Sequence, residues 1–221
     1  MPNDTSLSAW RLYAIIDRSA APDRDLAQLA QQAIEGGADV LQLREKTAST
    51  RQLLDDAQRL LRIARAARVP LIINDRVDVA AAVGADGVHL GQDDLPVALA
   101  RQLLGPGRLV GKSTHSLEQA LAADREGADY IAIGPIFPTP TKPDAPSVGL
   151  AVIAQVRAQV QRPTVVIGGI DEQTLPAVLA AGAQCVAVVR AVCGADEPDA
   201  AAHRLKRALA QFVHTTASPR L

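Results

Sequence analysis

Short hydrophobic runs alternate along the chain with longer segments that mix apolar and charged residues. The runs are continuous rather than alternating with polar residues, which is typical of parallel strands covered on both faces. They predict strands at residues 12–17, 40–44, 71–73, 88–90, 109–112, 130–134, 164–168 and 185–189. The segments between them predict helices at residues 25–35, 50–68, 77–83, 95–104, 149–160, 171–181 and 199–212, and another that opens with Ser116 as its cap.

A short repeat supports this arrangement. Gly-Ala-Asp stands just before a hydrophobic run at residues 37–39, 84–86 and 127–129, and Gly-Ala-Gln does so at 182–184. The repeat therefore marks every second predicted strand. Eight strand–helix units in order predict an α/β protein with a single-domain (β/α)8 TIM barrel. An open doubly wound sheet is the alternative, but no GxGxxG loop follows the first run.

The expected domain organisation is simple. We expect a loose polar lead-in at residues 1–10, a barrel catalytic domain at 11–213 and a frayed tail at 214–221. A chain of 221 residues can bury one substantial core, and a second domain is not expected.

Charge and composition narrow the classes of partner. A net charge of −1 argues against non-specific binding to nucleic acid. No apolar run reaches the roughly 20 residues of a membrane span, and we see no secretory signal. The only cysteines, Cys185 and Cys193, lack metal-finger spacing. We therefore expect a reduced, cytoplasmic protein with small-molecule substrates, either a monomer or a homo-oligomer.

Two acidic residues follow neighbouring predicted strands. Asp75 comes after the third strand and Asp94 after the fourth, so both side chains should emerge at the carboxyl ends of adjacent strands. Two unit charges about 4 Å apart repel by roughly 4 kcal/mol at an effective dielectric of about 20. Such a pair favours a cation, and oxygen ligands indicate Mg2+ shared with a phosphate. The alternative is that each aspartate caps the helix that follows it.

The second predicted strand carries polar residues with a spacing of two. Gln42, Arg44 and Lys46 should point to the same side, whereas Leu41 and Leu43 face the helices. A fork-shaped guanidinium suits phosphate oxygens, so we favour an anionic ligand here. The alternative is that Glu45 or a neighbouring acid pairs with these cations near the rim.

Further polar residues lie after the fifth and sixth strands. Ser113 is placed to donate to a ligand, His115 is as consistent with a structural role as with proton transfer, and His89 is expected to be a core residue. The proline-rich stretch at residues 134–143 reads as a stiff loop or lid, in which Lys142 can reach a phosphate. An ordinary surface loop is the alternative.

The seventh and eighth strands end in residues suited to a phosphate. Gly168 and Gly169 follow one strand, and Val189 and Arg190 end the other. Many barrels bind phosphate at this position. The chain thus offers two anion sites, an acidic pair and no obvious nucleophile–base couple, a pattern that suits departure of a diphosphate assisted by a metal.

Six motifs together resemble the thiamine-phosphate synthase family. They are QLREK (42–46), NDR (74–76), VHLGQDD (88–94), STHS (113–116), GPIFPTPTK (134–142) and IGGI (167–170), in family order. The resemblance implies a transferase of thiamine biosynthesis that joins 4-amino-2-methyl-5-(diphosphooxymethyl)pyrimidine to 4-methyl-5-(2-phosphooxyethyl)thiazole by a dissociative mechanism, with diphosphate as the leaving group.

The resemblance also implies roles for individual residues. Asp75 and Asp94 would bind Mg2+. Gln42, Arg44, Lys46, Asn74, Ser113 and Lys142 would hold the pyrimidine diphosphate, and Arg44, Lys46, Ser113 and Lys142 would act in catalysis. The thiazole phosphate would be held by Thr139, Pro140, Thr141, Gly169, Val189 and Arg190.

Two positions depart from the family pattern. Arg190 stands where a small residue is usual, so its side chain would either strengthen or obstruct the phosphate site, and Lys112 stands where an apolar residue is common. Two other functions remain as alternatives. One is the related thiazole tautomerase, which would use His115, and the other is a non-catalytic barrel that binds thiamine precursors. The retained aspartate pair argues against both.

Overall fold

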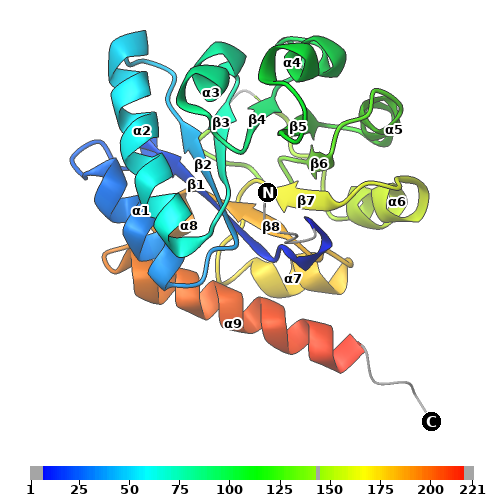
Figure 1. Cartoon of the computed structure of the whole chain (residues 1–221). Coiled ribbons are helices and arrows are strands. Elements are labelled where there is room, and N and C mark those ends of the chain that lie inside the picture. The colour runs from blue at the N-terminus through cyan, green and yellow to red at the C-terminus, as the bar shows by residue number, and fades with distance from the viewer. Residues whose placement is uncertain (1–6, 143–144, 217–221) are drawn as a thin grey trace.

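A computed structural model describes residues 7–142 and 145–216 of the chain. Eight parallel strands close into a barrel in the order β1 to β8, and the helices surround it (Figure 1). The strands are β1 (Leu12–Asp17), β2 (Val40–Arg44), β3 (Leu71–Asn74), β4 (Gly87–Leu90), β5 (Leu109–Thr114), β6 (Tyr130–Ile133), β7 (Thr164–Ile167) and β8 (Val186–Val188). The predicted TIM barrel and all eight predicted strands are confirmed.

The helices also follow the predicted order. They are α1 (Leu26–Glu35), α2 (Thr50–Ala67), α3 (Val77–Val83), α4 (Val97–Leu104), α5 (Leu117–Arg125), α6 (Ala151–Gln159), α7 (Leu175–Ala180), α8 (Arg190–Cys193) and α9 (Pro198–Thr216). The short helix α8 was not predicted. Helix α7 begins later than expected because the Asp171 carboxylate accepts hydrogen bonds from the N–H groups of Gln173 and Thr174, which makes a turn before the helix.

Two segments at the ends of the barrel differ from the sequence-based expectation. Residues Leu7–Ala9 form a 3-10 helix, η1, and Trp10 is 3 % exposed, so the lead-in is ordered from residue 7 onward. Trp10 closes the amino-terminal end of the barrel by packing edge-on against Tyr13 and Tyr130. At the other terminus, α9 runs past the predicted end at residue 212 and packs on α1, α7 and α8. Residues 1–6 and 217–221 lie outside the described residues.

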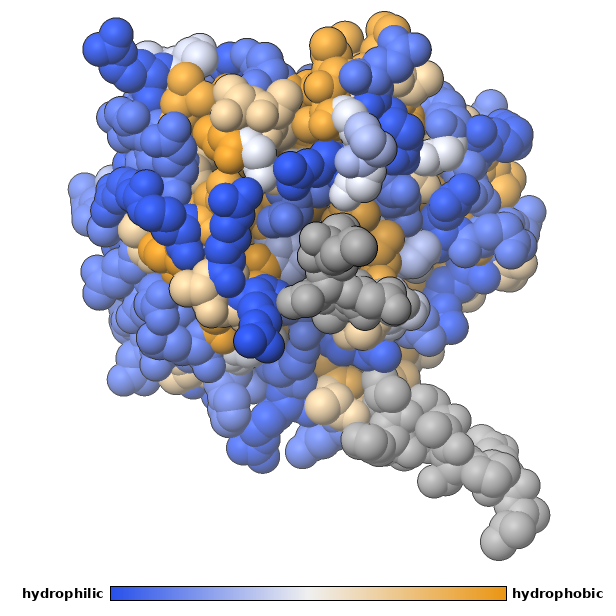
Figure 2. Space-filling view, viewed as in Figure 1, coloured by the Kyte–Doolittle hydropathy of each residue, from blue (hydrophilic) through white to orange (hydrophobic). Residues whose placement is uncertain are grey.

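Side chains sort into two apolar layers, as a closed barrel requires. Leu41 and Leu43 lie between the strands and the helices, whereas Val40 and Ile72 lie inside the barrel. Most of the surface seen in Figure 2 is hydrophilic, with apolar atoms over α4 at the top of the view. The exposed large hydrophobic residues of the described chain lie on or just before this helix: Leu95, Leu99 and Leu103. Within the described residues, no helix combines the length and apolar character needed to cross a bilayer.

The Gly-Ala-Asp repeat holds strands together in pairs. In each copy the glycine has a positive φ, which turns the chain from the helix into the strand. The Asp86 carboxylate then accepts a hydrogen bond from the N–H of Leu71, the first residue of β3. Asp39 does the same for Leu12 in β1, and Asp129 for Val110 in β5. The aspartates thus satisfy backbone groups where odd-numbered strands begin.

Removing one of these carboxylates should destabilise the barrel. In Asp129→Ala, the buried N–H of Val110 loses its acceptor, and the Arg101 guanidinium loses the carboxylate 2.9 Å away and keeps only backbone carbonyls as acceptors. We expect the free energy of unfolding to fall by about 1–3 kcal/mol, measured by urea denaturation. Asp129→Asn keeps an acceptor oxygen and serves as the control, with a smaller expected loss. Equal stability of the wild type and the alanine variant would contradict this role.

Candidate functional site

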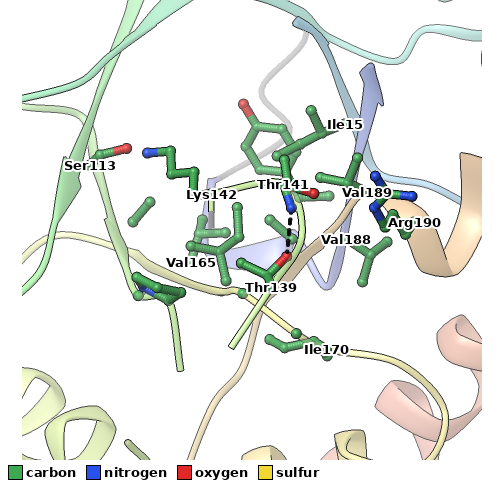
Figure 3. Close-up of a pocket in the computed structure, with 18 of the residues that line it drawn as sticks. Ile15, Ser113, Thr139, Thr141, Lys142, Val165, Ile170, Val188, Val189 and Arg190 are labelled. Atoms are coloured by element: carbon green, nitrogen blue, oxygen red, sulfur yellow. Dashed lines mark hydrogen bonds between the residues drawn. The ribbon is translucent and has the colours of Figure 1, made fainter. Parts of the chain in front are cut away.

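The carboxyl ends of the strands open into a cavity of about 430 Å³ (Figure 3). It is lined by eleven of the residues that the sequence singled out: Gln42, Arg44, Asn74, Ser113, Thr139, Pro140, Thr141, Lys142, Gly169, Val189 and Arg190. Three others, Lys46, Asp75 and Asp94, do not line the cavity. Apolar side chains that the sequence did not single out, including Ile15 and Val165, also line it, so the cavity suits a ligand with both ring and anionic parts.

The two predicted metal-binding aspartates lie next to each other. Asp75 follows β3 directly and has a φ of +61°, a left-handed conformation that a non-glycine residue seldom adopts. Its carboxyl group lies within hydrogen-bonding reach of Asp94. Burial, and then the nearby Asp75, raises the pKa of Asp94 above its ordinary value. The Lys46 ammonium forms an ion pair with Asp75.

The alternative that these aspartates cap helices is wrong. The residue at the N-cap of α3 is Arg76, and that of α4 is Pro96, and neither helix has a side-chain cap. The Asp94 carboxylate instead accepts a hydrogen bond of 2.6 Å from the N–H of Gly91 in its own loop. Ser116 does act as a cap for α5, as predicted.

The aspartate pair fits an ion that takes only part of its coordination shell from the protein. Within the described residues, no cluster of three or more His, Cys, Asp or Glu side chains is arranged to hold a metal. Two neighbouring carboxylates, of which Asp94 has a raised pKa, are nevertheless suited to a hard divalent cation. Mg2+ commonly uses one or two carboxylates together with phosphate oxygens and water.

Lys112 holds the loop that carries Asp94. Its side chain is buried, with 6 % of the residue exposed, and its Nζ donates a hydrogen bond of 2.7 Å to the carbonyl of Gly91. The N–H of the same Gly91 donates to Asp94. Lys112 therefore fixes the backbone to which one member of the aspartate pair is bonded, which gives this departure from the family pattern a structural role.

The cations of β2 are paired with neighbouring acids. Arg44 lies 2.5 Å from Asp17, which is 2 % exposed and also accepts hydrogen bonds from Ser19. Glu45 pairs instead with Arg18. The alternative to an anionic ligand, in which neighbouring acids pair with Arg44 and Lys46, is thus observed, with Asp17 and Asp75 rather than Glu45 as the acids. An anionic ligand at these cations stays a prediction.

Sequence reasoning missed Asp17, although a signal was present. Tyr13, Ile15 and Asp17 have the same spacing of two as Gln42 and Arg44, and Asp17 is aligned with Arg44 in the β1–β2 register. An acid at the inward-facing end of β1 is therefore a natural partner for an arginine at the end of β2.

The loop after β6 folds over the cavity. Lys142 points toward Ser113 in Figure 3. Loss of water around its ammonium, and then the nearby Arg44 and Lys46, lower the pKa of Lys142. The loop packs tightly on Gly168 and Gly169, where an added Cβ would lie 2.4 Å from Pro135 and 2.7 Å from Phe137, respectively. These glycines are thus required for packing of the loop, whatever they bind. Residue 143, in the predicted loop, lies outside the described residues.

The opposite side of the cavity is formed by the start of α8. Val189 is its N-cap residue and Arg190 its first residue. The Arg190 side chain is exposed at the cavity edge (Figure 3), and no carboxylate of the described residues pairs with it. The side chain therefore does not fill the cavity, and its charge is available to an anion.

The two histidines that line the cavity, His89 and His115, have different environments. His89 is buried, as expected, and its ring nitrogens contact Tyr130 and Ser113. Burial lowers the pKa of His89 to about 3. His115 lines the cavity, and its Nδ1 lies 2.5 Å from the carbonyl oxygen of Gly134, so this nitrogen is engaged with the backbone.

The state of His89 can be checked directly. Because its pKa is lowered from 6.5 to about 3, the imidazole should stay neutral between pH 5 and 8. We expect the ring nitrogen signals of His89 in 15N NMR spectra to be constant over this range. The folded state should correspondingly lose stability as the pH falls below about 6.5, where the unfolded chain binds the proton more readily. A titration step of His89 near pH 6.5 would contradict the burial argument.

Comparisons with known proteins identify the family of the chain. A family model described as thiamine monophosphate synthase matches residues 12–192. A thiamine-phosphate synthase from Chloroflexus aurantiacus is 52% identical over 198 residues, covering 89% of this chain and 91% of the relative. One from Shouchella clausii is 45% identical over 204 residues, covering 92% and 98%. The solved thiamine phosphate pyrophosphorylase from Pyrococcus furiosus superposes with a TM-score of 0.86 at 36% identity, covering 94% of this chain and 98% of that one.

The family match spans most of the barrel, and the relatives match over nearly their whole length. The resemblance drawn from the motifs is thereby confirmed. The chain is a transferase and belongs to the thiamine monophosphate synthase family.

Proposed function

We propose that this chain condenses 4-amino-2-methyl-5-(diphosphooxymethyl)pyrimidine with 4-methyl-5-(2-phosphooxyethyl)thiazole, giving thiamine phosphate and pyrophosphate. The observation that carries the proposal is the aspartate pair beside three cations, Arg44, Lys46 and Lys142, at the mouth of one cavity. Such a concentration of charge suits a diphosphate and its counterion better than a neutral substrate.

The cavity divides between the two substrates. We assign the pyrimidine diphosphate to the side lined by Gln42, Arg44, Asn74, Ser113 and Lys142, together with Lys46, which is paired with Asp75 outside the lining. The thiazole phosphate is assigned to the side formed by residues 139–141, Gly169, Val189 and Arg190. Ser113 with Lys142, and Val189 with Arg190, stand on different sides of the cavity in Figure 3, which supports this division.

The chemistry follows from what the side chains supply. Asp75 and Asp94 would hold Mg2+, which when bound neutralises charge on the departing pyrophosphate. Arg44 and Lys142 are placed to stabilise the same charge by direct contact with phosphate oxygens. Burial lowers the pKa of His89, so this imidazole supplies no strong base. A dissociative reaction, in which pyrophosphate departs before the thiazole nitrogen attacks, needs none.

We further propose a cytoplasmic location and no nucleic-acid or membrane partner. The proposed organisation is a lead-in at residues 1–10, a barrel at 11–213 and a tail at 214–221, in a monomer or a homo-oligomer.

The metal assignment is tested by removing one carboxylate at a time. With both substrates present, Asp75→Asn and Asp94→Asn should each lower Mg2+-dependent pyrophosphate release by on the order of a hundredfold, because stabilisation of the leaving group is lost. Asp93→Asn is the matched control, since Asp93 is exposed beside Asp94. It should retain activity within about twofold. Circular dichroism checks that each variant is folded.

Other results of this assay would favour the alternatives. Full activity in either asparagine variant refutes the metal assignment. A wild-type protein that binds both substrates without releasing pyrophosphate favours the non-catalytic barrel. If His115→Ala removes a tautomerase activity on the thiazole while pyrophosphate release is absent in the wild type, the thiazole tautomerase is correct.

The role of Lys112 predicts that its replacement weakens binding of Mg2+ without lowering the activity at saturating Mg2+. In Lys112→Met, Gly91 loses its charged hydrogen-bond partner, so Asp94 is held less firmly. We expect the Mg2+ concentration for half-maximal activity to rise about threefold to tenfold, or roughly 1 kcal/mol, with little change at saturating Mg2+. Arg108→Met is the control, because Arg108 donates to the carbonyl of Gly84 at the opposite end of the barrel. Identical Mg2+ dependence in both variants would contradict this role of Lys112.

A further inference from the structure

A continuous network of hydrogen-bonded side chains crosses the interior of the barrel at the floor of the cavity, which Tyr13 and His89 line together with Gln42 and Ser113. Gln42 Nε2 donates to the Tyr13 hydroxyl over 2.8 Å, and the hydroxyls of Tyr13 and Tyr130 are 2.9 Å apart. The Tyr130 hydroxyl lies 3.1 Å from His89 Nδ1, and His89 Nε2 lies 2.8 Å from Ser113 Oγ. This hydrogen-bond network joins five strands, β1, β2, β4, β5 and β6.

A glycine on β5 leaves the space that this hydrogen-bond network needs. Gly111 stands where a Cβ would lie 2.1 Å from Tyr130 Cζ and 2.6 Å from His89 Nδ1, so any side chain there would break the contact between Tyr130 and His89. The His89 and Tyr130 rings are stacked with their centroids 5.5 Å apart, and Trp10 packs against Tyr130 from below. Tyr13, Tyr130, His89 and Gln42 are all buried.

The direction of every hydrogen bond in this network follows from its first member. Each hydroxyl has one proton, and Tyr13 receives a hydrogen bond from Gln42, so its own proton is directed to Tyr130. Tyr130 then donates to His89 Nδ1. A neutral imidazole that accepts at Nδ1 carries its proton on Nε2, which donates to Ser113.

The two ends of the network therefore present complementary groups to the cavity, which both Gln42 and Ser113 line. Gln42 directs one amide hydrogen to Tyr13, which leaves its Oε1 as a hydrogen-bond acceptor for the cavity. Ser113 has accepted from His89 and offers its proton, a donor. Rotating the Gln42 amide would reverse every bond, so that Gln42 would offer a donor and Ser113 a lone pair.

We propose that this network is a polarised relay, in which Tyr13 and Tyr130 are positioning residues that couple recognition of the pyrimidine ring at Gln42 to recognition of the diphosphate at Ser113. The inference rests on the proposed function for its ligand but not for its geometry. When Gln42 offers an acceptor and Ser113 offers a donor, the network suits a ring that bears an amino group together with an anionic phosphate. A ring that bears a carbonyl in place of the amino group would demand the reverse polarity, and Ser113 would then turn a lone pair toward the anion.

The relay predicts the tautomer of His89, which NMR measures without any substrate. In 15N–1H correlation spectra of the wild type, we expect the proton on Nε2. Tyr13→Phe should leave this tautomer unchanged, because Tyr130 still donates to Nδ1. Tyr130→Phe removes the donor and should give a mixture of the two tautomers. A merely structural role of the tyrosines would alter stability in both variants without distinguishing them in this way.

Substrate discrimination gives the second measurement. The wild type should bind the amino-pyrimidine diphosphate more tightly than its 4-oxo analogue, and either phenylalanine variant should reduce the ratio of the two dissociation constants by about tenfold, because Gln42 can then rotate independently of Ser113. The KM for the thiazole phosphate should change by less than about twofold, since that substrate is assigned to the other side of the cavity.

The outcomes separate the two proposals. A wild-type His89 protonated on Nδ1, or a Tyr130→Phe variant with an unchanged tautomer, overturns the relay. An unchanged discrimination ratio in both variants overturns the coupling. If the predicted tautomers are found but no condensation occurs, the proposed function fails while the polarity of the relay stands. The wild-type spectrum decides the polarity even if a variant does not fold.

Discussion

The mutual repulsion of Asp75 and Asp94 is the constraint to which the other charged groups of the rim are adapted. Two neighbouring carboxylates raise each other's affinity for protons and cations, and a protein keeps them together only by fixing both backbones. Asp75 is held in a left-handed conformation, and its N–H donates to the carbonyl of His89. Asp94 is held through Gly91, which Lys112 anchors from the helix side of the barrel.

The same balance of charge extends to the cations. Arg44 is paired with the buried Asp17, so its guanidinium is fixed in place at the cavity before any anion arrives. Prior fixing of this kind reduces the entropy lost on binding. Lys142, by contrast, lies on the loop after β6, and burial and the nearby Arg44 and Lys46 lower its pKa, so an anionic partner would stabilise its charged form. Arg44 is thus preorganised by its ion pair, whereas Lys142 is supplied by a loop.

Local rules in the sequence predicted the parts of the site that depend on local geometry. Because side chains alternate along a strand and parallel strands end at one rim, Gln42, Arg44, Asn74 and Ser113 were placed correctly at the cavity. The partnership of Asp17 with Arg44 and that of Tyr130 with His89 depend on the register between strands and on closure of the barrel. A list of motifs does not contain that information. Helix α8 was missed because four residues are too few for a periodic pattern.

The repeat that marks the even-numbered strands is incomplete in one respect. Asp39, Asp86 and Asp129 tie β1 to β2, β3 to β4 and β5 to β6, but Gln184 stands at the corresponding position before β8 and makes no such bond in the described chain. Of the four junctions at which the repeat stands, that of β7 and β8 is therefore the one held by ladder hydrogen bonds and packing without a carboxylate. Local opening of the sheet should cost less free energy here than at the three junctions that an aspartate ties, and the side of the cavity next to β8 would be the more adaptable one.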